Sequence, residues 1–228
     1  MIEIETRAII IAAGEAKRWN NYLNVPKHLI EIDGEPILYR TVRLLRERGV
    51  SDIHIVGPQD DRYKVSGANL YVPTKEPKNQ DADKFLNSRY LWNKEGRTVV
   101  LYGDVFFTDD AMDSIVNFER IEWTLFCRFK RSSITGTRWG ECFAQSFYPA
   151  DIPSHEEKLY YIADLKRKNI ISRCGGWEHY RAMNDQTDER VRRPHKKYDK
   201  YVEINDWTED FDTPEDYDRF MENWNRSK

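Results

Sequence analysis

An unbroken apolar run near the start of the chain constrains the fold more than any other feature of the sequence. The run spans Ala8–Ala13, consists of isoleucine and alanine, and ends at Gly14. Because it does not alternate with polar residues, it predicts a strand buried on both faces, as in the parallel sheets of α/β proteins. A second such run, Thr98–Tyr102, ends at Gly103-Asp104. Together the two runs predict a parallel sheet with helices on both faces.

Other periodic segments supply the remaining strands and helices of such a sheet. Shorter strands are predicted at 28–32, 52–56, 68–72, 123–129, 142–148 and 201–204, with a turn at Asp33-Gly34. Helices are predicted between Pro36 and Gly49, at 82–93 and 110–118, over most of 155–190, and from Thr213 onward. An inward-facing stripe on the last helix consists of Tyr217, Phe220, Met221 and Trp224.

Charge and cysteine content exclude several classes of protein. The 228 residues carry a net charge of −3, so there is no overall attraction to nucleic acid or to acidic membranes. The three cysteines form no Cys-x-x-Cys pair, and we expect neither a zinc site nor a disulfide framework. The N-terminus lacks a signal pattern and its apolar run is too short to span a bilayer, so a cytoplasmic protein is expected. We interpret the basic stretch 190–200 as a solvated loop, with a phosphate contact as the alternative.

Small residues and two cations follow the first strand. Ala12, Ala13 and Gly14 close the strand, and Arg18 and Lys27 lie in the polar segment beyond it. In open α/β sheets, ligands bind beyond the carboxyl ends of the strands, where small residues allow a close backbone approach. Backbone N–H groups of such a turn form an anion-binding concavity, to which arginine and lysine add positive charge. The segment therefore predicts a phosphate-binding loop, although it matches neither a Walker loop nor a Gly-x-Gly-x-x-Gly fingerprint.

This loop resembles the signature of the sugar-phosphate nucleotidyltransferases, the MobA-like NTP transferase domains. That signature reads Ala-Ala/Gly-Gly-x-Gly-x-Arg, followed later by Pro-Lys. The matching residues, in order, are Ala12, Ala13, Gly14, Arg18, Pro26 and Lys27, whereas Ala16 replaces the second glycine. If that glycine needs a positive φ, alanine costs about 1 kcal/mol. The resemblance implies a three-layer, Rossmann-like α/β fold with a mixed, mostly parallel sheet and helices on both faces.

The resemblance also implies a divalent metal, since nucleotidyl transfer requires charge neutralisation on the phosphates. Mg²⁺ binds hard oxygen ligands, commonly one or two carboxylates together with phosphates and waters. Asp104, at the end of the second long strand, is the first expected ligand. Asp212 resembles the first aspartate of the family's late Ile-Asp-x-x-x-Asp pattern, and Asp206 and Asp210 are its competitors. We interpret Asp81-Ala-Asp83 as a helix start rather than a metal motif.

Further similarities point toward one subfamily. Asn87-Ser88, Gly103–Phe107 and the segment around Trp177 look like the corresponding segments of bacterial choline-phosphate cytidylyltransferases. This similarity suggests CTP as the nucleotide, with Asn87 and Ser88 near the base. The aromatic residues could also form a cage for a quaternary ammonium group, although core packing explains most of them. The similarity fades at about 130–163, where contacts to the acceptor would be expected.

The resemblance implies a transfer in which an NMP group moves from an NTP to a phosphorylated small molecule and pyrophosphate is released. Lys27 and Arg18 would stabilise phosphate charge, and Asp104 and Asp212 would hold Mg²⁺. A single domain of residues 1–228 is expected, with a nucleotide-binding half (about 1–120), an acceptor half (about 121–200) and a closing strand and helix (201–228). No nucleic acid or membrane partner is expected, and a homodimer stays open.

Two alternative functions remain compatible with the sequence. An A-type glycosyltransferase would share the fold and use a nucleotide-sugar, but Val105 and Phe106 follow Asp104 where an Asp-x-Asp motif is typical. A non-catalytic nucleotide-binding protein would bind nucleotide without releasing pyrophosphate. Fold alone does not decide among these functions.

Overall fold

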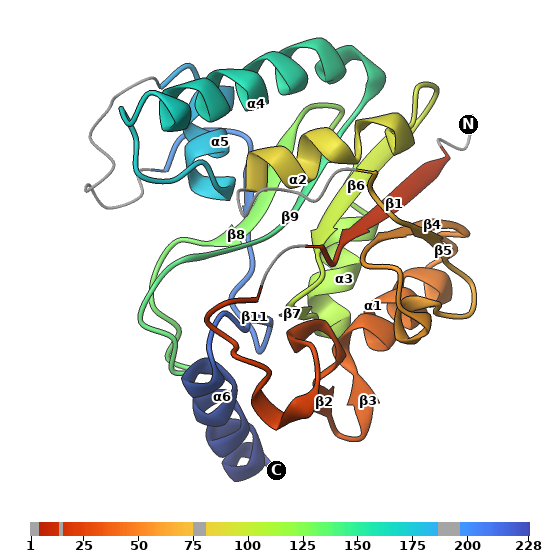
Figure 1. Cartoon of the computed structure of the whole chain (residues 1–228), viewed down its shortest axis with the longest axis vertical. Helices are drawn as coiled ribbons and strands as arrows, with labels where there is room; N and C mark the ends of the chain where they lie inside the picture. Colours follow the sequence, from red (N-terminus) through yellow and green to blue (C-terminus); the bar gives the residue numbers. More distant parts are fainter. Residues whose placement is uncertain (1–4, 14–15, 75–80, 187–196) are drawn as a thin grey trace.

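A seven-stranded sheet forms the centre of the computed structural model, which describes residues 5–13, 16–74, 81–186 and 197–228 (Figure 1). The strand order is β10-β8-β9-β6-β1-β4-β5. Strand β9 runs antiparallel to both of its neighbours, whereas the other pairings of the sheet are parallel. The strands are β1 (Thr6–Ile11), β4 (Asp52–Val56), β5 (Asn69–Tyr71), β6 (Arg97–Tyr102), β8 (Thr124–Arg128), β9 (Glu141–Phe147) and β10 (Tyr201–Glu203).

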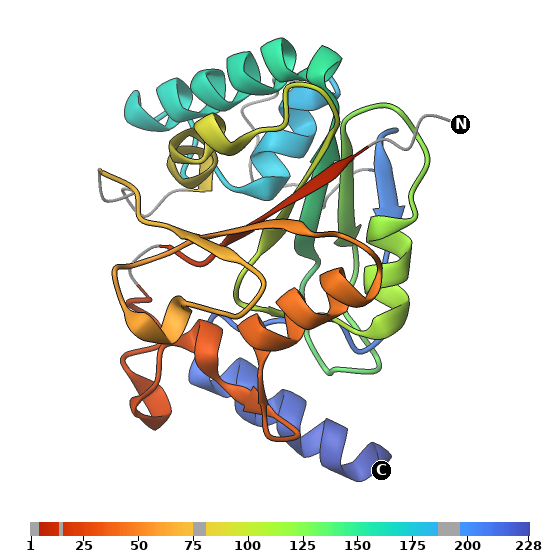
Figure 2. The same ribbon diagram turned by 90° about the vertical axis from the view of Figure 1, so that its right-hand side faces the viewer.

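Helices cover both faces of this sheet (Figure 1, Figure 2). One core lies beneath α1 (Ile37–Glu47) and α3 (Asp109–Val116). A second core lies beneath α2 (Asp81–Asn87), α4 (Ile152–Arg167) and α5 (Gly176–Met183). The predicted three-layer α/β fold with a mixed, mostly parallel sheet is therefore confirmed. Among the described residues, no helix is both long and apolar enough to cross a bilayer.

The unbroken apolar run of β1 serves both cores at once. Ala8 and Ile10 belong to the core under α1 and α3, whereas Ile9 and Ile11 belong to the core under α2, α4 and α5. Successive side chains of a strand point to opposite faces, so a central strand covered on both sides needs apolar residues at every position. Strand β6 shows the same division, and both strands are nearly inaccessible to solvent.

Two predicted elements differ from the structure. The strand expected at 28–32 is reduced to β2 (Glu31–Ile32), because Lys27–Leu29 form a 3₁₀ turn before it. Strand β2 pairs with β3 (Glu35–Pro36) through the predicted turn, in which Asp33 and Gly34 both have positive φ. The helix expected at 82–93 ends at Asn87, and a separate 3₁₀ turn covers Arg89–Leu91.

The remaining predicted elements agree with the structure to within a few residues. Three further short 3₁₀ turns lie at Tyr22–Asn24, Asp61–Tyr63 and Pro149–Asp151. The segment predicted as mostly helical, 155–190, contains α4 and α5 with a break between them, and its last four residues lie outside the described part of the chain.

The C-terminal helix α6 (Pro214–Ser227) closes a third, smaller apolar cluster below the sheet (Figure 1). Thr213 caps the helix, since its hydroxyl accepts from the N–H of Asp216, whose carboxylate in turn accepts from the N–H of Thr213. The fully buried ring of Phe220 and the partly buried Tyr217, Met221 and Trp224 form the predicted stripe. The cluster also contains Trp19, Ile30, Ile32, Ile37, Phe106 and Phe211, so α6 holds together the loops beyond the strand ends.

Two histidines are fully buried in the layer of α4 and α5. The ring of His155 stacks on Phe147 at 4.2 Å between centroids and lies 4.8 Å from the rings of both Trp92 and His179. No described residue makes a hydrogen bond to either ring nitrogen of His155, whereas Nδ1 of His179 lies 3.1 Å from Oε1 of Gln145. Burial holds the pKa of His155 well below its ordinary value and lowers the pKa of His179 to about 3.

This burial predicts that the protein loses stability in mild acid. As the pH falls below about 6.5, the unfolded state takes up protons that the folded state does not, so stability declines until about pH 3. His155→Phe removes one such group and two unpartnered nitrogens, whose burial costs about 1–3 kcal/mol. We therefore expect the substitution to raise the melting temperature by a few degrees at about pH 6 and to make its pH dependence shallower. Thermal unfolding followed between about pH 5 and about pH 8 measures both effects.

His179→Phe serves as the matched control, because it removes a histidine of the same layer that does have a partner. This substitution leaves Gln145 without the imidazole, so we expect it to gain less stability than His155→Phe, or to lose some. A lower melting temperature for His155→Phe than for the wild type would contradict the prediction.

Candidate functional site

The carboxyl ends of β1 and β6 meet at the centre of the sheet. Ile11 and Tyr102 are register partners, and the N–H of Gly103 donates to the carbonyl of Ile11 at 2.9 Å. A Cβ atom on Gly103 would lie 2.8 Å from that carbonyl oxygen and 3.0 Å from Cα of Ala12, so only glycine allows this approach. The contact places Asp104 beside Ala12 and the loop that follows it.

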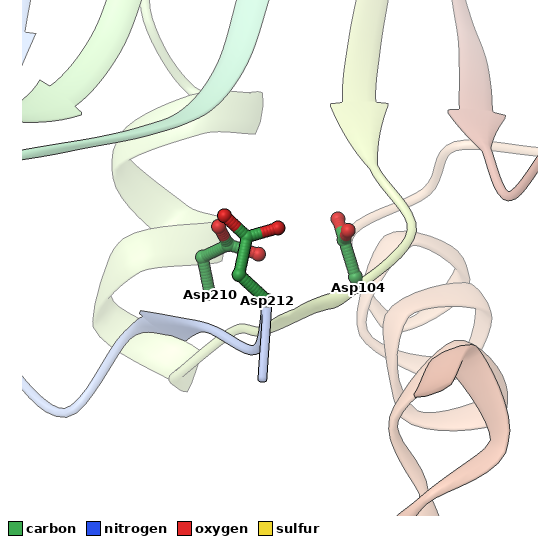
Figure 3. Close-up of side chains that lie close together, drawn as sticks. All are labelled: Asp104, Asp210 and Asp212. Atoms are coloured by element: carbon green, nitrogen blue, oxygen red, sulfur yellow. The ribbon is translucent and has the colours of Figure 1, made fainter. Parts of the chain in front are cut away.

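A short antiparallel ladder brings two more carboxylates to Asp104. Strand β11 (Glu209–Asp210) pairs with β7 (Val105–Phe106), and Asp210 lies opposite Val105. The N–H of Phe211 also donates to the carbonyl of Asp104, at 3.1 Å. In Figure 3 the side chains of Asp104, Asp210 and Asp212 point toward one another, and one oxygen of each lies within 4.8 Å of the others.

Asp206, the third aspartate considered from the sequence, takes no part in this cluster. Its carboxylate accepts from the N–H of Thr208 at 2.7 Å and from the hydroxyl of Thr108. These bonds tie the turn before β11 to the start of α3. The structure therefore brings both Asp210 and Asp212 to Asp104, where the sequence left a choice among the three.

Two predicted cations contact the carboxylate cluster. The ammonium of Lys27 hydrogen bonds to Asp104 and lies 3.6 Å from Oδ1 of Asp212. Nη2 of Arg18 lies 2.7 Å from Oδ2 of Asp212. The side chain of Lys27 is 13% exposed and that of Arg18 is 63% exposed, so Lys27 is the inner charge and Arg18 the outer one.

The pKa values of Lys27 and Asp104 show how these charges balance. Burial alone would lower the pKa of Lys27, but the charges of Asp104, Asp210 and Asp212 raise it well above its ordinary value. Burial alone would raise the pKa of Asp104, but Lys27, His28 and Lys84 together hold it at about 2. Both groups are therefore charged at neutral pH, and each is stabilised mainly by the other.

The charge of Lys27 compensates Asp210 only in part. Its Oδ1 atom is buried and makes no hydrogen bond to any described residue. Burial, together with the charges of Asp104, Asp212 and Glu141, raises its pKa well above the ordinary value. A divalent cation would supply the missing opposite charge, and three carboxylates are hard oxygen ligands of the kind that Mg²⁺ prefers. The residues present thus fit the expected metal.

A fourth carboxyl group, that of Glu141 at the start of β9, lies near the cluster. Burial and the charges of Glu209 and Asp212 raise the pKa of Glu141 to about 8. Glu141 was not predicted from the sequence, because it lies in the segment where the resemblance faded. A charged residue at the start of a strand that is otherwise buried is the one signal that could have identified it.

The structure places the other predicted site residues as follows. Ala12 and Ala13 are buried directly after β1, and Gly14 lies outside the described residues. Asn87 is half-buried at the end of α2, whereas Ser88 is fully buried and its hydroxyl donates to the carbonyl of Phe85 at 2.7 Å.

Ala16 packs against the apolar cluster of Trp19, a contact that a glycine would not make. The side chains of Asp81 and Asp83 lie outside the described part of the chain.

Such a sheet, with cations and carboxylates gathered beyond its central strands, defines a nucleotidyltransferase-like α/β domain. Residues 8–119 match the family model of the MobA-like NTP transferase domain. The resemblance seen in the sequence is therefore confirmed over these residues.

Curated relatives match over limited segments. The bifunctional IPC transferase and DIPP synthase of Thermococcus kodakarensis is 38% identical over 84 residues, which are 37% of this chain and 17% of that protein. The bifunctional protein GlmU of Acetivibrio thermocellus is 27% identical over 117 residues, which are 50% of this chain and 25% of that protein. The chain thus spans at most a quarter of the length of these relatives.

Solved structures extend the similarity to almost the whole chain. The inositol-1-phosphate CTP transferase from T. maritima superposes with a TM-score of 0.60 at 15% identity, covering 96% of each chain. The CTP:phosphocholine cytidylyltransferase from Streptococcus pneumoniae superposes with a TM-score of 0.53 at 18% identity, covering 96% of this chain and 99% of that one. At these identities the comparison shows a shared fold.

The unfavourable position of Asp210 predicts a stabilising substitution. The folded protein disfavours the charged carboxylate of Asp210, and this lowers the stability of the fold. The loss of stability is absent below about pH 4, where the carboxyl group is protonated in both the folded and the unfolded protein, and it grows as the pH rises. In EDTA at about pH 8, we expect Asp210→Asn to raise the melting temperature by about 2–4 °C for each kcal/mol relieved. Calorimetry of both proteins at about pH 8 and about pH 4 measures the difference.

The control for this prediction is Asp206→Ala, which removes a neighbouring carboxylate that has two donors. That substitution leaves the N–H of Thr208 without its acceptor, and we expect a lower melting temperature. A wild-type or lower melting temperature for Asp210→Asn at about pH 8 would show that the cluster is not strained.

Proposed function

We propose that this domain is a Mg²⁺-dependent nucleotidyltransferase. It moves an NMP group from an NTP, with CTP as the favoured donor, to a phosphorylated small molecule and releases pyrophosphate. The observation that carries the proposal is the position of Lys27, which lies between Asp104 and Asp212 directly beyond the central strands. The match of residues 8–119 to the MobA-like NTP transferase domain supports it.

Each group of the site has a role in this proposal. Lys27 and Arg18 bind phosphate oxygens, Lys27 as a compact charge and Arg18 through its planar guanidinium. The backbone after β1, at Ala12 and Ala13, approaches the nucleotide closely because its side chains are small. Asp104 and Asp212 hold Mg²⁺, and Asp210 lies in position to join them. When bound, Mg²⁺ neutralises charge on the α-phosphate and on the leaving pyrophosphate.

The proposed reaction is a single in-line displacement. An oxygen of the acceptor phosphate forms a bond to the α-phosphorus of the NTP, and the bond from that phosphorus to the bridging oxygen of pyrophosphate breaks. The electron pair of the broken bond leaves with pyrophosphate, so no covalent intermediate with the protein is needed. Catalysis then comes from positioning and electrostatic stabilisation by Lys27 and Arg18.

CTP and a phosphorylated acceptor are the finer part of the proposal. Two proteins of the same fold carry CTP in their names, and their acceptors are named as inositol-1-phosphate and phosphocholine. We place the base near Asn87, at the end of α2, and keep Ser88 as the buried support of that helix end. We place the acceptor on the side of residues 121–200, where Glu141 reaches the cluster.

The glycosyltransferase alternative receives less support from the geometry. Val105 and Phe106, which follow Asp104, are buried in β7 and offer no second carboxylate. Asp210 and Asp212 reach the cluster from a distant part of the chain instead. The Pro26-Lys27 segment, which has no assigned role in that alternative, supplies the inner cation of the site.

Thermal unfolding with each of the four NTPs, in Mg²⁺ and then in EDTA, tests the proposal first. A ligand that binds only the native state raises the melting temperature, by about 2.7 kcal/mol of stability at a hundredfold excess over Kd. We expect a Mg²⁺-dependent shift that is largest with CTP. The absence of a shift with every NTP would contradict the proposal, and a shift with a different NTP would correct the base.

Pyrophosphate release with a panel of phosphorylated acceptors then tests the reaction. We expect Lys27→Met to lower turnover by about 10²–10³-fold, the loss usual for one charge-stabilising group. Lys168→Met is the control, since Lys168 lies at the end of α4 and pairs only with Asp164 among the ion pairs described. A near wild-type rate for Lys27→Met would exclude its proposed role. Transfer of a sugar from a nucleotide-sugar would favour the glycosyltransferase instead.

A further inference from the structure

A fully buried ion pair lies directly behind the carboxylate cluster. Arg128, on β8, and Glu209, on β11, each have side chains that are 1% exposed. Nη2 of Arg128 donates to both carboxylate oxygens of Glu209, at 3.1 and 3.0 Å, and Nη1 donates to the carbonyl of Thr208 at 2.9 Å. The guanidinium also lies 5.4 Å from the ring centroid of Phe143. One side chain thus holds the backbone directly before β11 and the first side chain of β11.

Stability alone does not account for such a pair. Removing two charges from water costs several kcal/mol each, and apolar side chains of similar volume often stabilise a protein as well or better. The surroundings are apolar enough for that replacement, since the same core contains Phe126, Phe143 and Ile204. The pair therefore calls for a role that depends on its geometry.

The geometry links the pair to the proposed metal ligands. Glu209 lies opposite Phe106 in the β7–β11 ladder, and the next residue along the chain is Asp210. The ladder has only two residues on each strand, so it defines the position of β11 weakly by itself. Arg128 adds a connection between β11 and the central sheet, because β8 belongs to that sheet.

We propose that Arg128 is a positioning residue, which holds β11 so that Asp210 and Asp212 face Asp104 at the spacing a divalent cation requires. Arg128 does not itself contact the carboxylate oxygens of the cluster. It acts through the carbonyl of Thr208 and the carboxylate of Glu209. This inference rests on the proposed function, since it assumes that the cluster binds a divalent cation.

A purely electrostatic role makes the opposite prediction for metal affinity. If Arg128 acted only through its charge, its removal would leave an additional negative charge beside the cluster and would tighten cation binding. In the same case Glu209→Gln would weaken binding, because the arginine charge would lose its counter-charge. If Arg128 positions β11, its removal weakens binding, whereas Glu209→Gln keeps an acceptor for the guanidinium and changes binding little.

Mn²⁺ binding to the full chain, followed by calorimetry or by the electron paramagnetic resonance of free Mn²⁺, separates these cases without any substrate. We expect Arg128→Met to weaken Mn²⁺ binding by about 10–100-fold, the usual effect of removing a group that orients metal ligands. We expect Glu209→Gln to remain within about threefold of the wild type, and melting temperatures to be recorded for every variant.

Arg97→Met is the matched control, because Arg97 is another buried arginine that binds backbone carbonyls. Arg97 lies on β6 and donates to the carbonyls of Ile115 and Val116 at the end of α3, each at 2.7 Å. We expect this variant to lose stability and to bind Mn²⁺ as the wild type does. If Arg128→Met does not fold, Arg128→Lys takes its place, since one ammonium cannot reproduce the two-sided grip of the guanidinium.

The possible outcomes separate the positioning role of Arg128 from the proposed function. Wild-type protein that fails to bind Mn²⁺ would overturn the metal site and the proposed function together. If the wild type binds Mn²⁺ and the Arg128 variant binds it equally well or more tightly, the positioning role alone is overturned. Weakened binding in Arg128→Met, with Arg97→Met and Glu209→Gln unchanged, supports it.

Discussion

The ladder between β7 and β11 is the connection on which the candidate site depends. It joins the segment that leaves β6 to the segment that enters α6, and so brings Asp210 and Asp212 to Asp104. Like charges at this spacing repel one another, and the backbone would separate them if it were free to move. Buried apolar residues on both sides of the ladder, together with the third core under α6, hold it closed. Hydrophobic burial and backbone hydrogen bonds thus offset the repulsion among the three carboxylates.

The carboxylates of the site differ in how well nearby cations compensate their charge. Lys27 and Asp104 stabilise each other's charged forms, as the opposite shifts of their pKa values indicate. Asp210 and Glu141 keep raised pKa values because burial and neighbouring carboxylates outweigh the opposing charges of Lys27 and Arg128. Strongly perturbed carboxyl groups that gather in one place are common at functional sites. The pattern matches a site for a cation and a phosphate group, since carboxylates and cationic side chains are both present.

The fold followed from the sequence more directly than the site did. The runs at Ala8–Ala13 and Thr98–Tyr102 predicted central strands because a strand buried on both faces needs apolar residues at nearly every position. The resemblance favoured Asp212 over its competitors Asp206 and Asp210, but only the register of the β7–β11 ladder decides which of them face Asp104. Glu141 and Arg128 were missed for a related reason. Buried polar residues contradict the apolar pattern from which strands are recognised, and their partners become visible only in three dimensions.

The site is completed outside the region that carries the family's match. That match ends at residue 119 and includes Lys27 and Asp104, whereas Asp210 and Asp212 come from the segment before α6. The same later part of the chain supplies β8, β9 and β10, and with them Arg128 and Glu141. The matched half could bind phosphate through its loop, but it would lack two of the three carboxylates and the arginine that holds them. Under the proposed function, sequence changes after residue 119 would alter the acceptor side and the metal side together, so two proteins of this fold could share the loop after β1 while differing in substrate.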